Sequence, residues 1–232
     1  AVLDRGGLLV DGREVSEPHK RDFAWPAALA ERRGLGAGRP RDLLAVVRAV
    51  RPTVLVGVSG QPGMFDEPVV RALAEGTPRP VVFPMSNPTS KAEARPADVL
   101  RWSEGRALVA TGSPFDPVPF GGRDVRIGQC NNAFVFPGLG LGVLASEARQ
   151  VTDGMFAAAA DRLAGEVRDE DLAAGSLFPP QSRIRAVQAA VAEAVVRQAR
   201  EEGVGAAIAD AAIPQVVRAA MWDPRHPRVV PA

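Results

Sequence analysis

Thr53-Val54-Leu55-Val56-Gly57-Val58-Ser59-Gly60 is the stretch that decides the fold. Its first six residues form a nearly continuous β-branched run, which is typical of a parallel strand covered on both faces. Small residues continue to Gly63 after the strand ends. In an open α/β sheet ligands bind at that edge, where glycine lets the backbone approach a cofactor closely. A plain tight turn from strand to helix explains the same residues equally well.

Two further segments repeat this pattern along the chain. Pro80 to Met85 is an apolar run that leads into Ser86-Asn87-Pro88-Thr89. Arg106 to Thr111 is another, and it leads into Gly112-Ser113. Three strands that each end in a small polar loop predict one sheet with its loops gathered at one edge.

Helices are predicted between these strands. Apolar residues recur at helical spacing over Arg41–Val50 and Asp66–Glu75. Ser90 and Glu93 have capping-box spacing, so we expect a helix to start there with Lys91 in its first turn. Strands that alternate with helices predict an α/β fold: an incomplete Rossmann-like, doubly wound parallel sheet, followed by a helical C-terminal segment.

The first residues of the chain carry a possible nucleotide contact. Ala1-Val2-Leu3-Asp4 resembles the end of a buried strand capped by an acid, where a nucleotide-binding βαβ unit places the carboxylate that bonds the ribose hydroxyls. A simple turn or helix cap explains an aspartate here as well. The chain opens on this apolar run without a methionine, so we expect it to be part of a longer protein.

Two adjacent amides, Asn131 and Asn132, stand at the start of the C-terminal part. Amide side chains donate and accept hydrogen bonds without titrating, which suits the positioning of a carboxylate or hydroxyl group. A turn that tolerates unusual backbone angles is the competing interpretation. Apolar and alanine-rich patterns beyond them predict a buried glycine-containing helix and three more helices: Phe134–Ala145, Thr152–Val167, Ile184–Glu201 and Pro214–Trp222.

Composition excludes several classes of function. The net charge is +1 and the charges are scattered, so the sequence shows no nucleic-acid or membrane-binding patch. Cys130 is the single cysteine, which excludes an internal disulfide and predicts a cytoplasmic location. Tyrosine is absent, and His19 and His226 are the only histidines. A Tyr or His general acid must therefore come from near the termini or from another chain.

Taken in order, five motifs closely resemble the C-terminal half of malic enzymes. They are Leu3-Asp4, Gly57-Val58-Ser59-Gly60, Ser86-Asn87-Pro88-Thr89-Ser90-Lys91-Ala92-Glu93, Gly112-Ser113-Pro114-Phe115-Asp116-Pro117, and Gly128-Gln129-Cys130-Asn131-Asn132 with Phe136-Pro137-Gly138. Phe178-Pro179-Pro180 extends the resemblance over essentially the whole chain.

The resemblance implies oxidation of L-malate with NAD or NADP, followed by decarboxylation to pyruvate and CO2. It implies that Asn87 and Asn131 bond the substrate. Cofactor contacts are implied for Asp4, Val58, Ser59, Gly60, Ser86, Asn87 and Asn132. The divalent metal of the family, Mg or Mn, takes its ligands upstream of Asp4 in relatives, as do the catalytic tyrosine and lysine. We therefore expect the isolated chain to be inactive.

The resemblance also implies the organisation of the chain and its partners. Residues 1–132 are expected to form the NAD(P)-binding domain without its first βα unit, and residues 133–202 a helical segment that packs on the missing N-terminal catalytic domain. A helix and extended tail would follow over 203–232. The complete enzyme is expected to be a homo-oligomer, either dimer or tetramer.

Two cations, Lys20 and Arg5, bear on the choice between NAD and NADP. Lys20 lies three residues before Phe23, where NADP-using relatives carry a lysine, and Arg5 adjoins the acid expected to bind ribose. Because cations pair with the 2′-phosphate, we expect NADP. The alternative functional class is a non-catalytic nucleotide-binding or scaffold module derived from the same fold.

Overall fold

The computed structural model describes residues 1–12 and 17–223. Contacts divide the chain into two compact units. The first consists of residues 1–130 with 173–177, and the second of residues 131–172 with the described residues after 177. His226 and the predicted tail through Pro224, Pro227 and Pro231 lie outside the described residues.

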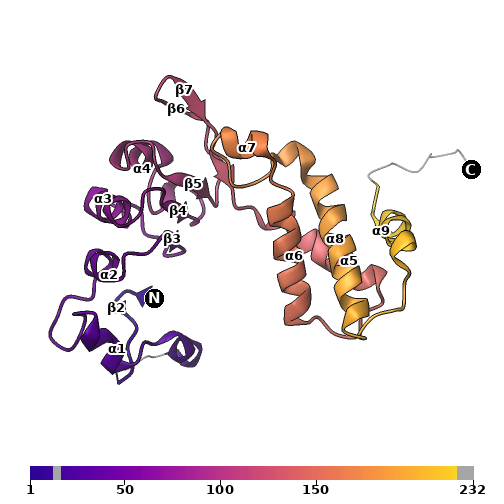
Figure 1. The fold of residues 1–232 in the computed structure, drawn as a ribbon, viewed down its shortest axis with the longest axis horizontal. Helices are drawn as coiled ribbons and strands as arrows, with labels where there is room; N and C mark the ends of the chain where they lie inside the picture. The colour runs from indigo at the N-terminus through magenta and orange to yellow at the C-terminus, as the bar shows by residue number, and fades with distance from the viewer. Residues whose placement is uncertain (13–16, 224–232) are drawn as a thin grey trace, which may run out of the picture. The chain divides into compact units, whose positions relative to one another are not determined.

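The first unit contains the predicted parallel sheet (Figure 1). Its strands lie in the order β3-β4-β5-β8, and every neighbouring pair is parallel. They are β3 (Val54–Gly57), β4 (Val81–Pro84), β5 (Leu108–Thr111) and β8 (Gly128–Gln129). The first three match predicted strands, and β8 is one that the sequence patterns missed. The sheet confirms the predicted Rossmann-like α/β class.

Three helices connect and cover these strands: α2 (Leu43–Val50), α3 (Glu67–Gly76) and α4 (Pro96–Trp102). Val70 and Leu73 of α3 pack with Val82 of β4 and Val109 of β5 in one core. Asp42 and Asp66 cap α2 and α3 by accepting a backbone N–H each, from Ala45 and Val69 respectively. Both helices were therefore predicted correctly, within two residues.

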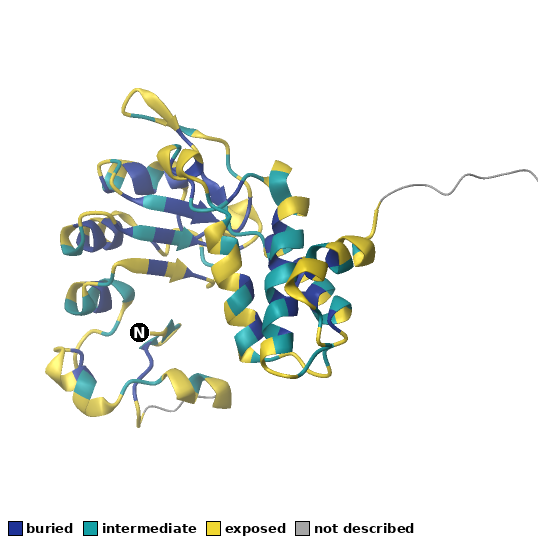
Figure 2. Cartoon of the chain, turned by 45° about the vertical axis from the view of Figure 1, so that its right-hand side comes forward, coloured by how far each residue is buried: buried dark blue, intermediate teal, exposed yellow. Residues whose placement is uncertain are grey.

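The exposed face of β3 contradicts the expected double coverage. Leu55 and Gly57 are buried, but Val54 and Val56 are 47% and 53% exposed (Figure 2). Residues alternate between the faces of a strand, and β3 lies at the edge of its sheet. A β-branched run indicates strand formation, but it does not show whether a second layer is present to cover it.

The N-terminal residues also differ from the prediction. Leu3 and Asp4 form β1 (Leu3–Asp4), but this strand is half-buried and pairs antiparallel with β2 (Gly7–Leu8). The chain reverses because Gly7 adopts a φ of +90° and the Gly6 N–H donates to Asp4 Oδ1 at 2.8 Å. The interpretation of Ala1–Asp4 as the end of a buried strand was therefore wrong.

A small separate core supports this hairpin. It contains Leu8, Val10, Ala30, Leu35 and Val46. The surrounding elements are a 3-10 helix, η1 (Pro18–Phe23), and α1 (Ala27–Arg32). A second antiparallel hairpin, β6 (Val118–Phe120) with β7 (Arg123–Val125), lies elsewhere in the unit.

The predicted helix start at Ser90 is absent. Thr89–Lys91 forms a short 3-10 helix, η2, and α4 begins only at Pro96. Glu93 does not cap a helix, because its side chain turns into the protein and is fully buried. Capping-box spacing was misleading here: it identifies a possible cap but does not exclude a distant hydrogen-bond partner.

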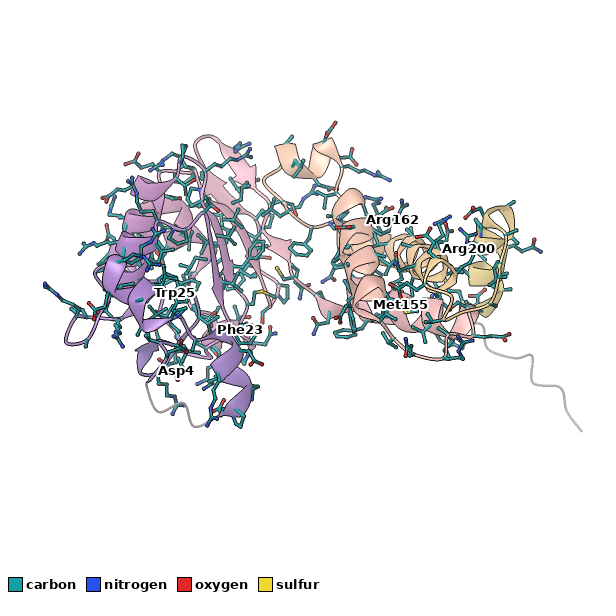
Figure 3. The ribbon with its side chains drawn as sticks, turned by 60° about the horizontal axis from the view of Figure 1, so that its bottom comes forward. Asp4, Phe23, Trp25, Met155, Arg162 and Arg200 are labelled. Atoms are coloured by element: carbon teal, nitrogen blue, oxygen red, sulfur yellow. The ribbon has the colours of Figure 1, made fainter. Side chains whose placement is uncertain are left out.

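The second unit is helical, with α8 (Ile184–Glu201) at its centre. Around it pack α5 (Phe136–Ala145), α6 (Asp153–Gly165) and α9 (Ile213–Ala220). Shorter elements complete the unit: η3 (Asn132–Phe134), α7 (Asp169–Ala173, whose last residue is assigned to the first unit), η4 (Gln181–Arg183) and η5 (Asp210–Ala212). Met155 of α6 is fully buried among these helices (Figure 3). The predicted long helices are confirmed.

Glycine allows α5 and α8 to approach each other. Gly138 and Gly142 are buried against α8, as predicted for close packing. The helix is not buried on all sides, however, because Phe136 is 58% and Leu144 77% exposed. An all-apolar sequence did not reveal which side of α5 the chain itself covers. None of the helices in the described residues is long and apolar enough to cross a membrane.

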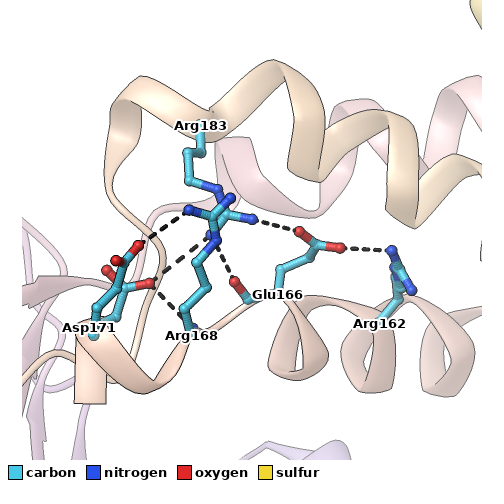
Figure 4. A network of polar contacts seen from close by, with 6 residues as sticks. Arg162, Glu166, Arg168, Asp171 and Arg183 are labelled. Carbon is cyan, nitrogen blue, oxygen red and sulfur yellow. Dashed lines mark hydrogen bonds and ion pairs between the residues drawn. The ribbon is translucent and has the colours of Figure 1, made fainter. Parts of the chain in front are cut away.

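An arginine joins three segments of the second unit (Figure 4). Arg183 donates from Nη2 to Glu166 Oε2 at 2.8 Å and from Nη1 to the Glu166 carbonyl oxygen at 2.9 Å. Its Nη1 also lies 3.9 Å from Oδ2 of Asp171, which is only 2% exposed. Arg162 contacts the other carboxylate oxygen of Glu166 at 2.7 Å but is 49% exposed. Arg183 is only 20% exposed, so it is the more buried of the two arginines on this carboxylate.

We expect Arg183→Ala to lower the free energy of unfolding by about 2–3 kcal/mol, because it removes a charged partner from carboxylates shielded from water. Arg162→Ala is the matched control, with an expected loss of under about 1 kcal/mol, because solvent screens its ion pair. Urea denaturation of both variants measures the difference. Equal losses would contradict the role assigned to Arg183.

Candidate functional site

Three loops meet at the carboxyl edge of the sheet. They follow β3, β4 and β5, and backbone hydrogen bonds join neighbours beyond the strands: Met85 N–H to the Gly57 oxygen at 2.9 Å, and Gly112 N–H to the Pro84 oxygen at 3.3 Å. A Cβ on Gly112 would lie only 2.0 Å from the Met85 oxygen. Glycine is therefore required where the second and third loops pass each other.

Glu93 connects the first loop to the second. Its Oε1 accepts hydrogen bonds from Ser59 N at 2.7 Å, Ser59 Oγ at 2.8 Å and Ser86 Oγ at 2.5 Å. Its Oε2 accepts a longer one from Ser86 N at 3.3 Å. Ser86 Oγ in turn accepts the Gly60 N–H at 2.8 Å. One carboxylate thus holds two strand-end loops together.

The surroundings of Glu93 explain its charge state. Burial alone raises the pKa of a carboxyl group, but hydrogen bonds from Ser86 and Ser59 outweigh burial and lower the pKa of Glu93 from its ordinary value. Because the pKa of Glu93 is lower in the folded state, its ionised form stabilises the fold at pH values above the ordinary pKa of a carboxyl group. That stabilisation is lost as the pH falls through the lowered pKa. Glu93 is therefore ionised at neutral pH.

Gly57 makes room for this carboxylate. A Cβ at Gly57 would lie 2.6 Å from Glu93 Cδ and 2.7 Å from the ring of Phe65. Sequence reasoning gave Gly57 a possible role in cofactor approach, and the structure shows a close approach to Glu93. Sequence reasoning assigned Glu93 to a helix cap and missed its role at this edge. The available signal was an acid flanked by Ala92 and Ala94, an apolar setting in which a carboxylate needs internal partners.

Asn87 is fixed from the third loop. Ser113 Oγ donates to Asn87 Oδ1 at 2.5 Å, and the Ser113 carbonyl oxygen accepts from Thr111 Oγ1 at 2.7 Å. Ser113 is buried, whereas Asn87 is exposed. Because the oxygen of the amide receives the serine proton, the nitrogen with its two donors points elsewhere. Ser113 is a second residue whose positioning role the sequence did not reveal.

The residues of the first loop are exposed to solvent. Val58 is 79% exposed, and Ser59 and Gly60 are also exposed. Gly60 has a φ of +66°, and a Cβ there would meet no atom within 4 Å. An open loop that contains glycine, at this edge of the sheet, would let the phosphates of a nucleotide approach closely. Ser86 is nearly buried, with its hydroxyl group engaged by Glu93 and Gly60.

The structure brings together Asp4 and Lys20. Lys20 Nζ lies 3.8 Å from Asp4 Oδ2 and 3.0 Å from Glu17 Oε2. Asp4 is marked in Figure 3 and is only partly exposed. Arg5 is exposed beside it. The ammonium group of Lys20 is thus already balanced by two carboxylates.

Asn131 and Asn132 begin the second unit. Asn131 Oδ1 accepts the Ala133 N–H at 2.9 Å, so part of its role is to cap η3, in line with the turn interpretation. Its amide nitrogen retains two donors. Asn132 is exposed. Since Asn87 belongs to the first unit, a shared substrate site for Asn87 and Asn131 stays a prediction.

Neither a cysteine nucleophile nor a metal site is supported in the described part of the protein. Burial raises the pKa of Cys130 to about 12, so the thiol is not a nucleophile at neutral pH. Within residues 1–12 and 17–223, no three His, Cys, Asp or Glu side chains gather into a possible metal site. The residues present therefore do not fit the divalent metal of the resemblance.

A hollow of about 340 Å³ beside the β6–β7 hairpin contains none of the predicted site residues.

Comparison with known sequences gives a consistent answer. The family model described as malic enzyme, NAD binding domain, matches residues 1–200. The NAD-dependent malic enzyme of Edwardsiella ictaluri is 45% identical over 228 residues, which cover 96% of this chain and 39% of the relative. The NAD-dependent malic enzyme of Pseudomonas aeruginosa UCBPP-PA14 is 44% identical over 225 residues, covering 97% and 40%. These names do not support the expected preference for NADP.

Solved structures show the same fold. The malic enzyme of Entamoeba histolytica superposes with a TM-score of 0.69 at 22% identity, covering 94% of this chain and 41% of that one. The malic enzyme of Pyrococcus horikoshii gives a TM-score of 0.60 at 24% identity, covering 77% and 36%. The chain spans about 40% of the length of the curated relatives it matches. From this family match over residues 1–200, the chain belongs to the malic enzyme family.

Proposed function

We propose that the protein containing this chain oxidises L-malate with NAD and decarboxylates the product to pyruvate and CO2. This chain would hold the nicotinamide nucleotide and one end of the substrate. The observation that carries the proposal is the fixed amide of Asn87, held by Ser113 at the same sheet edge as the open Ser59–Gly60 loop. That edge is where ligands bind in open α/β sheets.

The chemistry of this edge is positioning. NAD, when bound, would accept the hydride that malate loses on oxidation. Asn87 would donate from Nδ2 to the hydroxyl or a carboxylate oxygen of malate, while Ser113 keeps the amide oxygen turned away. Asn131, whose oxygen caps η3, would bind with its remaining donors. Neither amide titrates, so proton transfer would fall to the upstream tyrosine and lysine that the family resemblance implies.

The charges around Asp4 favour NAD over NADP. Asp4 is proposed to bond the ribose hydroxyls, with Lys20 holding its carboxylate in place. With Glu17 also present, two negative charges surround one positive charge, and a 2′-phosphate would bring more negative charge to them. Arg5 could offset only part of this. The NADP preference first expected from Lys20 is therefore replaced by a proposed preference for NAD.

Asp4→Asn in the full-length enzyme is expected to reduce the preference for NAD over NADP by about 10-fold, because it removes a negative charge near the 2′ position. The ratio of kcat/KM for the two cofactors measures the change. Asp11→Asn, an exposed acid nearby in the sequence, is the control and should leave the ratio unchanged. An unaltered ratio in Asp4→Asn would remove Asp4 from cofactor discrimination.

The proposed function is tested with the full-length protein. Purified protein should reduce NAD only when L-malate and a divalent metal are supplied, and should release CO2 in equal amount. The chain of residues 1–232 alone is expected to be inactive, because it contains no tyrosine and its described residues hold no metal site. Full-length protein that binds NAD without malate-dependent turnover would instead support the scaffold alternative.

Other expectations about the complete protein follow from the same family. A missing catalytic domain, a dimeric or tetrameric assembly and a cytoplasmic location all stay predictions. So does the proposed division of this chain at residues 132 and 202. The exposed apolar residues Phe136 and Leu144 of α5 support packing of the helical segment on another domain.

A further inference from the structure

The buried carboxylate of Glu93 holds the proposed cofactor loop, and its hydrogen bonds go to neither Asn87 nor Asn131. Glu93 is 0% exposed and accepts four hydrogen bonds, all from Ser59 and Ser86. Burial of a charge is costly unless partners satisfy it fully. An apolar side chain would fill this space without that cost, so stability alone does not explain a carboxylate here.

Hydrogen-bond donors at this site can be counted. Each serine hydroxyl has one proton, and both Ser59 Oγ and Ser86 Oγ donate it to Glu93. Ser59 Oγ also accepts from Gln61 N at 3.2 Å, and Ser86 Oγ accepts from Gly60 N at 2.8 Å. The two hydroxyls therefore have no proton left for a ligand. They instead bind the backbone of the open loop.

We propose that Glu93 is a positioning residue for the nicotinamide cofactor. It orients the two serine hydroxyls so that they fix the backbone of residues 59–61. Because the N–H groups of these residues and both hydroxyl protons are donated within the site, the loop then meets the cofactor through its backbone carbonyl groups and Val58. The inference rests on the proposed function, because it assigns the loop to NAD. Ser59 and Ser86 were expected to contact the cofactor, and the inference gives their hydroxyls a role in holding the loop instead.

Asn87 has separate support, which makes the inference specific. Its amide is held by Ser113 from the neighbouring strand end. Loss of Glu93 should therefore loosen the loop after β3 more than it displaces the proposed substrate amide. Cofactor affinity should change more than the maximal rate of malate oxidation.

The test is direct NAD binding, measured by isothermal titration calorimetry on the full-length protein. Glu93→Gln leaves a similar shape but replaces one acceptor oxygen with a donor group, which conflicts with the serine protons. We expect Kd for NAD to rise about 10-fold, the size expected for the loss of one or two hydrogen bonds. KM for NAD should rise in parallel, and kcat should change by less than about 3-fold.

Two further variants separate positioning from simple loss of stability. Leu73→Ala opens a cavity in the same core, where Leu73 is fully buried, and should lower Tm without changing Kd for NAD. Ser86→Ala removes the hydroxyl that joins Glu93 to Gly60, and should by itself raise Kd for NAD.

A combined variant tests whether Glu93 acts through the two serines. Adding Glu93→Gln to Ser59→Ala/Ser86→Ala should have much less effect on Kd than Glu93→Gln alone, because the hydroxyls that connect Glu93 to the loop are already absent.

The outcomes distinguish this inference from the proposed function. Unchanged Kd for NAD in Glu93→Gln and Ser86→Ala would overturn the inference while leaving malate oxidation intact. Equal changes in Leu73→Ala, or full additivity with the serine variants, would do the same. If the unsubstituted protein binds NAD but does not oxidise malate, the proposed function fails and the binding measurements still decide the role of Glu93. Should Glu93→Gln not fold, Ser86→Ala alone decides it.

Discussion

Replacing Asn87 with alanine in the full-length enzyme is expected to lower kcat/KM for malate by about 100- to 1,000-fold, the range seen when an oriented polar contact to a reacting group is lost. The reason is geometric. Ser113 Oγ donates to Asn87 Oδ1 at 2.5 Å, so the two amide donors are directed away from the protein contact and are available to the substrate. Steady-state kinetics with malate varied at saturating NAD measure the loss.

Asn87→Asp is the matched control for this prediction. Aspartate retains an acceptor for Ser113 but has no donors for malate, and its charge repels the substrate carboxylates, so activity should fall at least as far as in the alanine variant. Ser113→Ala should cost less, about 10-fold, because the amide remains but can rotate. Near-normal activity in Asn87→Asp would show that Asn87 does not donate to the substrate.

Gly142→Ala is expected to lower the free energy of unfolding by about 2–3 kcal/mol, or Tm by about 5–10 °C. A Cβ at Gly142 would lie 2.6 Å from Val195 Cβ and 2.8 Å from the Ala192 carbonyl oxygen on α8. Backbone cannot move aside as a flexible side chain can, so the two helices must separate. Thermal unfolding followed by circular dichroism measures the change.

Gly140→Ala provides the opposite expectation within the same helix. In the chain of residues 1–232 by itself, a Cβ at Gly140 would meet no atom within 4 Å, so alanine should stabilise α5 there by about 0.5–1 kcal/mol through its higher helix propensity. The two substitutions have the same chemistry and differ only in what faces them. Similar Tm changes in both variants would show that α5 and α8 do not pack closely through Gly142.

Local patterns in the sequence predicted most of the secondary structure. The apolar runs that became β3, β4 and β5 each span only a few residues, and their alternation with helical periodicity was enough to identify a parallel α/β sheet. The loops after those strands were located at the same time, because parallel strands place their carboxyl ends at one edge. The predicted residues of the first unit's loops therefore do gather there.

Other features depended on partners far along the chain. Glu93 was expected to cap a helix, but it bonds Ser59, a residue 34 positions earlier. Lys20 was expected to bind the 2′-phosphate of NADP, but its ammonium group lies 3.8 Å from the carboxylate of Asp4, far earlier in the chain. Spacing rules describe neighbours within one turn of helix or one strand, and they contain no information about such contacts.

The sequence by itself determined that this chain forms a parallel sheet followed by alanine-rich helices, since short apolar runs and a periodicity of 3.6 residues are local properties of the chain. Only the tertiary structure decided which groups became partners: Glu93 with two serines, Ser113 with Asn87, and Lys20 with Asp4. The physical reason is that a buried polar group takes whichever donor or acceptor folding brings within about 3 Å, and separation along the chain does not specify that partner.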